Sequence, residues 1–194
     1  MEDKALLSTE EASGAEKAEL LIVIPAYNEA ENIERVVNHL TANFPQYDYV
    51  VVNDGSRDET AAICQRNGYN LLNLPVNLGL AGAFQAGLKY ADKYGYQYAV
   101  QLDGDGQHRP EYLESMIKKM EEGYDIVIGS RFVGEKKPFT MRMLGSNLIE
   151  MAIRFTTGVN IKDPTSGMRM FSKRMIREFA SGLNYGPEPD TVPT

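Results

Sequence analysis

Two carboxylates separated by one glycine, Asp103 and Asp105, follow an apolar segment and precede Gln107 and His108. Carboxylate oxygens on a short glycine-rich turn suit Mg²⁺ or Mn²⁺, ions that retain several waters and accept phosphate oxygens as further ligands. Gln107 and His108 could add contacts to such an ion. Asp-Gly pairs are also frequent in ordinary turns, so the spacing alone leaves a metal site and a plain turn as alternatives.

Polar residues also follow two other apolar runs of the chain. Residues 27–29 come after the run 20–24, and residues 54–56 come after the run 49–52. Continuous apolar runs of this length are typical of strands buried on both faces of a parallel sheet. Ligands bind at the carboxyl ends of such strands, so the three polar segments are predicted to meet there.

Apolar runs alternate with helical patterns along most of the chain. Residues 33, 36, 37 and 40 have the spacing of one helical stripe. Further strands are expected at 69–74, 98–102, 125–128 and 168–171, and further helices at 79–94, between Pro110 and Gly123, at 141–155 and at 173–180. This order predicts an α/β fold, a single Rossmann-like domain whose mostly parallel sheet is flanked by helices.

Two helix starts carry the spacing of a capping box, in which the capping side chain and a Glu three residues later each bind a backbone N–H group. Asn28 with Glu31 predicts the first of these starts. Ser56 with Glu59 predicts the second, and its helix is expected to stop at Gly68.

Charge and composition limit the classes of protein. The chain of 194 residues has a net charge of −7, of which −4 falls on residues 1–19, which hold six acidic residues and two lysines. The remaining −3 argues against a nucleic-acid partner, which needs a basic face. The single cysteine, Cys64, leaves no internal disulfide, suits a reducing cytoplasm and is expected to pack in the core.

Three regions are predicted along the chain. Residues 1–19 are polar and aperiodic and are expected to form a disordered acidic tail. Residues 20–183 are expected to form the folded domain. Residues 184–194 contain three prolines and no periodicity, and we expect an irregular segment that truncation of a longer domain would explain. No apolar run is long enough to cross a bilayer.

Six segments together resemble glycosyltransferase family 2. In order, they are residues 23–30 (VIPAYNEA), 52–60 (VNDGSRDET), 77–83 (NLGLAGA), 102–108 (LDGDGQH), 129–132 (GSRF) and 163–171 (DPTSGMRMF). The resemblance implies the GT-A fold and a nucleotide-diphosphate sugar as donor. Within the family, the last three segments look most like the dolichol-phosphate mannose synthase branch and its bacterial polyprenyl-phosphate relatives.

The resemblance also implies roles for the donor-binding residues. Pro25, Tyr27 and Glu29 would line the pocket for the nucleotide base and ribose. Asp54 would accept a hydrogen bond from the base, which is uracil or guanine in most members. Asp103 would belong to the nucleotide site as well as to the metal pair.

The metal and acceptor residues follow from the same resemblance. Asp103 and Asp105 would hold Mg²⁺ or Mn²⁺, with Asp105 the more direct ligand and Gln107 assisting. The remaining implied contacts are Arg131 near the diphosphate or acceptor, and Arg142, Ser166 and Arg169 at the acceptor.

The expected activity is inverting transfer of a sugar from a UDP- or GDP-linked donor to a polyprenyl phosphate or a cell-envelope saccharide. A saccharide hydroxyl would need a general base, for which Glu188 and Asp190 are the candidates, whereas a phosphate acceptor would need none. An amphipathic helix at 141–155 would bring the chain to the inner face of the membrane, and packing of this segment on the sheet is the alternative. A non-catalytic sugar-nucleotide-binding protein and a nucleotidyltransferase are the alternatives.

Overall fold

The computed structural model describes residues 18–104, 110–129 and 168–181. Within these ranges, six strands form one sheet: β1 (Leu20–Ala26), β2 (Asp48–Asp54), β3 (Leu71–Leu74), β4 (Tyr98–Gln101), β5 (Ile126–Ile128) and β6 (Arg169–Ser172). The helices are α1 (Ile33–Asn43), α2 (Thr60–Arg66), α3 (Gly79–Tyr94), α4 (Leu113–Glu121), which follows the 3₁₀ turn η1 (Pro110–Tyr112), and α6 (Lys173–Ser181). The predicted α/β class is confirmed.

The strand order is β3-β2-β1-β4-β6-β5. Where β1, β2, β3 and β4 pair with one another, they are parallel, as expected. β6 is antiparallel to both β4 and β5, and it lies between them. The sheet is therefore mixed, because a strand from late in the chain separates β5 from the parallel strands.

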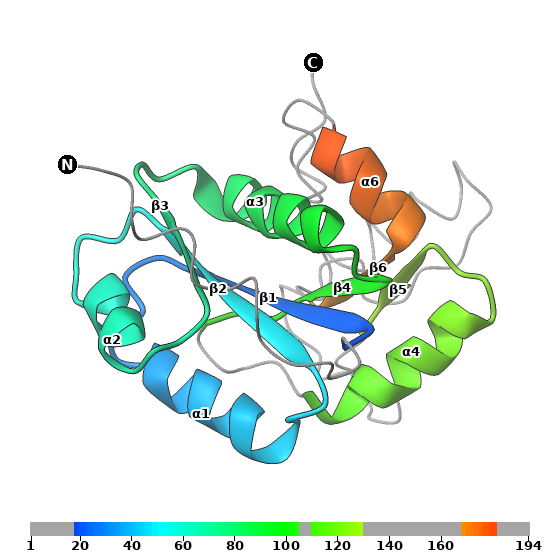
Figure 1. Cartoon of the computed structure of the whole chain (residues 1–194), viewed down its shortest axis with the longest axis horizontal. Helices are drawn as coiled ribbons and strands as arrows, with labels where there is room; N and C mark the ends of the chain where they lie inside the picture. Colours follow the sequence, from blue (N-terminus) through cyan, green and yellow to red (C-terminus); the bar gives the residue numbers. More distant parts are fainter. Residues whose placement is uncertain (1–17, 105–109, 130–167, 182–194) are drawn as a thin grey trace, which may run out of the picture.

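The helices cover both faces of the sheet, with α3 and α6 on one face and α1, α2 and α4 on the other (Figure 1). Both faces of the sheet are apolar, as the residues of β1 illustrate. Leu20, Ile22 and Ile24 pack into one apolar cluster, and Leu21 and Val23 pack into the cluster on the other face. The first cluster receives the predicted stripe of α1, formed by Ile33, Val36, Val37 and Leu40. Burying each such aliphatic side chain contributes about 1.5–3 kcal/mol. Among the described helices, none is long and apolar enough to cross a membrane.

Both predicted capping boxes are wrong. α1 begins at Ile33 rather than near Asn28, whose backbone is left-handed at φ 57°. α2 begins at Thr60, and Asp58 rather than Ser56 accepts a hydrogen bond from the Thr60 N–H group at 3.0 Å. The side chains of Asn28 and Ser56 instead bind backbone N–H groups of each other's loops.

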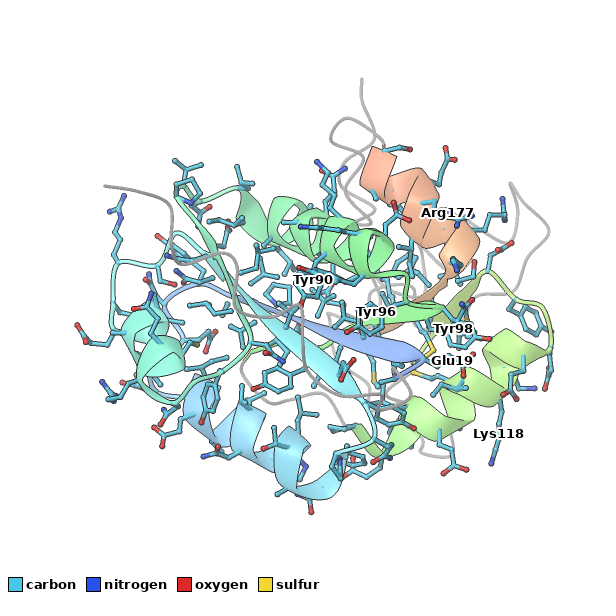
Figure 2. All side chains as sticks on the ribbon, in the orientation of Figure 1. Glu19, Tyr90, Tyr96, Tyr98, Lys118 and Arg177 are labelled. Carbon is cyan, nitrogen blue, oxygen red and sulfur yellow. The ribbon has the colours of Figure 1, made fainter. Side chains whose placement is uncertain are left out.

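At the amino-terminal end of the sheet, a hydrogen bond joins the residues that precede β4 to the start of β2. The Tyr96 hydroxyl donates a hydrogen bond to Asp48 Oδ2 at 2.7 Å, and Tyr96 lies between the sheet and the C-terminal part of α3, which carries Tyr90 (Figure 2). Burial, followed by the bond to Asp48, raises the pKa of Tyr96 far above its usual range, so the hydroxyl stays a neutral donor. The carboxyl end of the sheet carries the polar segments predicted to bind a ligand.

An ion pair joins the start of α6 to the residue before β5. Arg174 donates two hydrogen bonds to the Asp125 carboxylate, one of them from Nε at 3.0 Å, and the Ser172 hydroxyl donates a third at 2.8 Å. Arg174, together with Ser172, lowers the pKa of Asp125 below its usual value of 3.8. Because both side chains reach solvent, we expect a modest contribution to stability.

This lowered pKa predicts a pH-dependent stability. A carboxyl group with a depressed folded-state pKa stabilises the fold above its unfolded-state pKa, and the contribution is lost as pH falls through the folded-state value. The difference in unfolding free energy between the wild type and Asp125→Asn should therefore be constant near neutral pH and shrink below about pH 4. Urea unfolding at a series of pH values measures this difference, and a gap unchanged by acidification would contradict the assignment.

Candidate functional site

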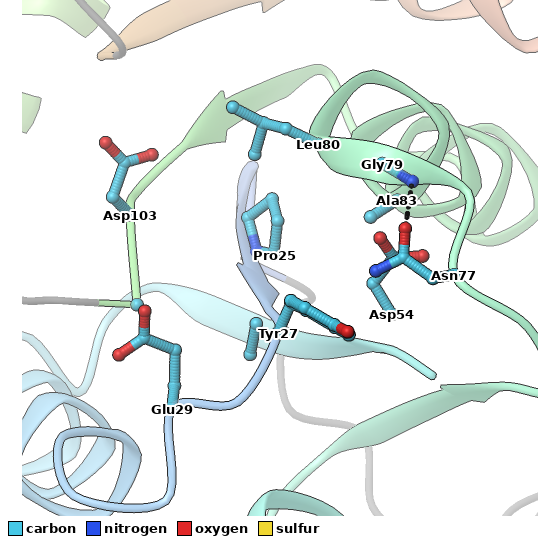
Figure 3. A pocket seen from close by; sticks show the side chains of 11 residues that line it. Pro25, Tyr27, Glu29, Asp54, Asn77, Gly79, Leu80, Ala83 and Asp103 are labelled. Atoms are coloured by element: carbon cyan, nitrogen blue, oxygen red, sulfur yellow. Dashed lines mark hydrogen bonds between the residues drawn. The ribbon is translucent and has the colours of Figure 1, made fainter. Parts of the chain in front are cut away.

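A pocket of about 440 Å³ lies at the carboxyl ends of β1, β2 and β4 (Figure 3). The chain runs from β1 outward through β2 to β3, and then returns to place β4 on the other side of β1. A reversal of this kind opens a crevice above the sheet, where ligands bind in doubly wound folds. The pocket is lined by Pro25, Ala26, Tyr27, Glu29, Asp54, Asn77, Gly79, Leu80, Ala83, Asp103 and Gly104.

Three of the predicted donor residues come from the end of β1 and the loop after it. Pro25 is buried within β1, whereas Tyr27 is 43% exposed and Glu29 is half-buried. Tyr27 extends toward the side of the pocket where Asp54 lies, and Glu29 lies toward Asp103 (Figure 3). The Glu29 carboxylate is held by the Asn32 side-chain amide, which donates to Oε2 at 2.9 Å.

Asp54 ends β2 and is 3% exposed. Its Oδ1 accepts a hydrogen bond from the backbone N–H of Leu78 at 2.7 Å, in the connection between β3 and α3. The family resemblance implies contact with the base alone for Asp54. The structure adds a second task, because this carboxylate also fixes the segment that leads into α3 and lines the pocket.

Gly55 allows that segment to approach. It has φ 64°, and a Cβ atom built there would lie 2.7 Å from the Asn77 nitrogen and 2.8 Å from the Val76 carbonyl carbon. Both contacts are with backbone, which cannot rotate away as a side chain could. The turn after β2 therefore requires glycine both for its dihedral angle and for the space beside it.

Replacing Gly55 with alanine should destabilise the fold more than replacing Gly68. Gly68 has a similar φ of 67° but no atom within 4 Å of a built Cβ. Gly68→Ala should lower the free energy of unfolding by about 1–2 kcal/mol, because alanine would have to adopt the left-handed backbone conformation. Gly55→Ala should lower the free energy of unfolding further, because its Cβ would also press on the backbone of residues 76–77 and displace the segment that lines the pocket. Urea unfolding of both variants measures the difference, and equal losses would contradict the close approach.

The start of α3 supplies pocket residues to which the sequence assigns no role. Asn77 Oδ1 accepts a hydrogen bond from the Gly79 N–H at 3.0 Å, and Leu80 and Ala83 face the cavity from the first turns of the helix. The segment 77–83 belongs to the family resemblance, and it follows a strand that ends at the ligand edge. That combination is the signal that could have identified these residues.

Asp103 follows β4 and lines the pocket opposite Asp54 (Figure 3). Its Oδ1 accepts a hydrogen bond from Gln101 Nε2 at 3.1 Å. Gly104 is buried against the β1 end, where a Cβ would lie 3.2 Å from the Pro25 carbonyl oxygen and 3.3 Å from Glu29 Cγ. Gly104, which separates the two residues of the predicted metal pair in the sequence, therefore lies directly against the loop that carries Glu29.

One residue of the predicted metal pair, Asp103, lies in the described part of the chain. Asp103 presents a hard oxygen ligand to the pocket. No group of three His, Cys, Asp or Glu side chains that could hold a metal ion occurs within residues 18–104, 110–129 and 168–181. An ion held by one or two carboxylates, with water and phosphate oxygens completing its shell, fits this donor set and is the habit of Mg²⁺.

The structure thus brings together five of the predicted site residues: Pro25, Tyr27, Glu29, Asp54 and Asp103. Arg169 is half-buried in β6, where it pairs with Ile128, and it does not line this pocket. The other predicted site residues lie outside the described part of the chain: Asp105, Gln107, Arg131, Arg142, Ser166, Glu188 and Asp190. The predicted helix at 141–155 lies outside it as well.

Cys64 is not part of the site. It is fully buried in the cluster between the sheet and α1, α2 and α4, as predicted. Burial raises the pKa of its thiol, so the reactive thiolate is disfavoured.

The strand order and the pocket at the reversal define a Rossmann-like α/β domain with a ligand site at its carboxyl edge. Residues 21–180 match the family model described as Glycosyl transferase family 2. The chain belongs to glycosyltransferase family 2, and its fold is of the GT-A type.

Two relatives show the range of similar proteins. The polyprenol monophosphomannose synthase of Mycolicibacterium smegmatis is 32% identical over 167 residues, which cover 81% of this chain and 63% of the relative. The UDP-N-acetylglucosamine–dolichyl-phosphate N-acetylglucosaminyltransferase of Methanococcus voltae is 32% identical over 186 residues, covering 84% of this chain and 73% of that protein.

A solved structure shares the fold. The glucosyl-3-phosphoglycerate synthase of Mycobacterium tuberculosis, in complex with Mn²⁺, UDP-glucose and phosphoglyceric acid, has a TM-score of 0.62 at 18% identity. The matched region covers 81% of this chain and 57% of that structure. This chain therefore spans less than two thirds of the mycobacterial relative and of the solved structure.

Proposed function

We propose that this chain is an inverting glycosyltransferase that uses a UDP- or GDP-linked sugar and a divalent cation, and that its acceptor is a polyprenyl phosphate. The observation that carries the proposal is the pocket in which Tyr27 and Asp54 lie on one side and Asp103 on the other. Binding of such a donor requires two acidic side chains. One accepts a hydrogen bond from the nucleobase, and the other holds a cation beside the diphosphate.

Residues of the pocket and of the predicted metal pair would each bind a different part of the donor. Asp54 would accept from an N–H of the base, and the exposed ring of Tyr27 would cover the nucleoside. Asp103 and Asp105 would hold Mg²⁺ or Mn²⁺, with Gln107 assisting. That ion, when bound, supplies positive charge next to the diphosphate. Arg131 would add a charge-assisted contact to the same oxygens.

In the proposed transfer, the bond between the anomeric carbon and the diphosphate oxygen breaks, and the nucleoside diphosphate leaves with the electron pair. An acceptor oxygen forms the new bond from the opposite face of the sugar, so the configuration at that carbon inverts. A phosphate oxygen is already anionic and needs no base to remove a proton. Arg142 and Arg169 would bind that phosphate.

The two relatives support the choice of acceptor. Their names specify different sugars, mannose and N-acetylglucosamine, but both specify a polyprenol-type phosphate. The acceptor class is thus the shared feature, whereas the sugar varies. We further propose that this chain acts at the inner face of the membrane, where a lipid-linked phosphate would meet a cytoplasmic sugar nucleotide.

A turnover assay tests the proposal and separates the two acceptor classes. UDP- and GDP-sugars are offered in Mn²⁺ with undecaprenyl phosphate or with a free saccharide. We expect transfer to the lipid phosphate, and we expect Glu188→Gln and Asp190→Asn to retain most of it, since no base is required. Loss of turnover by orders of magnitude in either folded variant would instead favour a saccharide hydroxyl. Binding of a sugar nucleotide without transfer to any acceptor would favour the non-catalytic alternative.

A further inference from the structure

The loop between β1 and α1 is held by side chains of the loop between β2 and α2 and of Thr60, the first residue of α2. Three consecutive backbone N–H groups of the first loop donate across the gap: Asn28 to Ser56 Oγ at 3.0 Å, Glu29 to Thr60 Oγ1 at 2.9 Å, and Ala30 to Asp58 Oδ2 at 3.0 Å. A fourth bond runs the other way, from the Arg57 N–H to Asn28 Oδ1 at 2.9 Å. The loop so held carries Tyr27 and Glu29, which line the pocket.

Asp58 and Thr60 form the centre of this arrangement. The Thr60 hydroxyl donates to Asp58 Oδ1 at 2.5 Å, and the Thr60 N–H donates to the same oxygen at 3.0 Å. A hydroxyl has one hydrogen to donate, so the bond to Asp58 leaves the Thr60 oxygen lone pairs for the Glu29 N–H. The carboxylate therefore sets the direction of the hydroxyl that holds Glu29.

Thr60 and Asp58 differ in burial and in charge. Thr60 is fully buried, so the Glu29 N–H that reaches it would lose its partner if the hydroxyl were removed. Asp58, in contrast, is exposed. Burial alone would raise the pKa of Asp58, but the hydrogen bonds from Thr60 and Ala30 outweigh it and lower the pKa, so the carboxylate stays ionised at neutral pH.

We propose that Asp58 and Thr60, neither of which lines the pocket, are positioning residues that set its affinity for the nucleotide diphosphate. They act through the Glu29 and Ala30 backbone, which fixes where Tyr27 and the Glu29 carboxylate stand relative to Asp103. This inference rests on the proposed function, because it assumes that the pocket binds a nucleotide diphosphate.

The arrangement matters most for Glu29. Its side chain lies against Gly104, next to the turn of the predicted metal pair, with Glu29 Cγ at 3.3 Å from a Cβ built on that glycine. A shift of the β1–α1 loop would therefore move two residues together: Tyr27 on the base side of the pocket, and Glu29 beside Gly104. Loss of the Thr60 hydroxyl should weaken donor binding without removing any atom that touches the donor.

Calorimetry with UDP and GDP in Mn²⁺ tests the proposal on the full chain. Thr60→Val keeps the shape of the side chain but removes the hydroxyl, and we expect affinity to fall about tenfold. Thr60→Ser restores the hydroxyl and should restore affinity. Asp58→Asn, at an exposed position, keeps one of the two acceptor oxygens, so either Ala30 or Thr60 loses its partner, and the loss of affinity should be intermediate. In turnover, the KM for the sugar nucleotide should rise more than kcat falls.

Two controls separate positioning from general destabilisation. Glu59→Gln removes a neighbouring exposed carboxylate of the same loop and should leave affinity unchanged. Arg174→Ala breaks the ion pair with Asp125, remote from the pocket, and should lower thermal stability without changing affinity. If the wild type binds neither nucleotide, the proposed function is wrong and the positioning role falls with it. If the wild type binds and Thr60→Val binds equally well, the positioning role alone is overturned.

Discussion

Replacement of Asp103 by asparagine is expected to weaken Mn²⁺-dependent binding of UDP or GDP by more than about tenfold, or about 1.4 kcal/mol. Asp103 lies opposite Asp54 in the pocket and offers an anionic oxygen where a diphosphate would end. The amide keeps the size and one acceptor oxygen but loses the charge, so the change isolates the electrostatic contribution. Asp105→Asn is expected to give at least as large a loss, since it is the more direct proposed ligand.

The measurement is a titration of nucleotide diphosphate in Mn²⁺ and in a chelator. The wild type should bind much more tightly with Mn²⁺, and the variants should lose that difference. Asp92→Asn provides a matched control, because Asp92 lies on α3 in a long ion pair with Arg177 at 3.7 Å, away from the pocket lining. Unchanged affinity in both Asp103→Asn and Asp105→Asn would remove the cation from the proposal.

Asp54→Ala is expected to cost roughly 1–3 kcal/mol of nucleotide affinity, since a base N–H that is buried on binding would lose its acceptor. The alanine also removes the acceptor of the hydrogen bond from the Leu78 N–H at 2.7 Å, so the residue before α3 is no longer hydrogen-bonded to the end of β2. Asp54→Asn keeps one acceptor oxygen, which could serve Leu78, and this variant separates the two tasks of the carboxylate.

The two tasks are distinguished by the ligand. UDP and GDP contain the base, whereas ribose 5-diphosphate lacks it. A role in base recognition predicts that Asp54→Ala weakens the nucleotides and leaves ribose 5-diphosphate nearly unchanged. If ribose 5-diphosphate lost as much affinity as UDP, Asp54 would act only by holding the β3–α3 connection.

The periodic parts of the fold could be predicted from the sequence. Helix α3 spans Gly79–Tyr94 as expected, and the stripe of α1 is buried. Both patterns depend on local spacing, which a linear sequence displays directly. The place of β6 could not be predicted, because its pairing with β4 and β5 joins segments far apart in the chain.

The capping boxes show why a local rule can fail. Asn28 and Ser56 have the right spacing to a following Glu, but each binds the loop of the other, across 28 residues of sequence. Asp58, two residues before Thr60, accepts the hydrogen bond from the N–H of this first residue of α2. A short polar side chain can satisfy any nearby N–H group, and only the tertiary structure decides which one is near.

The pocket was predicted in outline. Asp54 and Asp103 follow separate buried strands, and the carboxyl edge of the sheet brings them into one cavity. The sequence assigns no role to Asn77 and Leu80, because two tertiary contacts bring the connection to α3 to the pocket: the bond from the Leu78 N–H to Asp54 and the close approach beside Gly55. Neither contact leaves a periodic trace in the sequence.

A crystal structure with a nucleotide diphosphate and Mn²⁺, recorded with the anomalous signal of manganese, tests the central claim most directly. We predict that the base lies beside Tyr27 and Asp54, and that the diphosphate and one manganese peak lie at Asp103. A nucleotide bound elsewhere on the chain, or a manganese peak remote from Asp103 while the nucleotide occupies the pocket, would contradict the account.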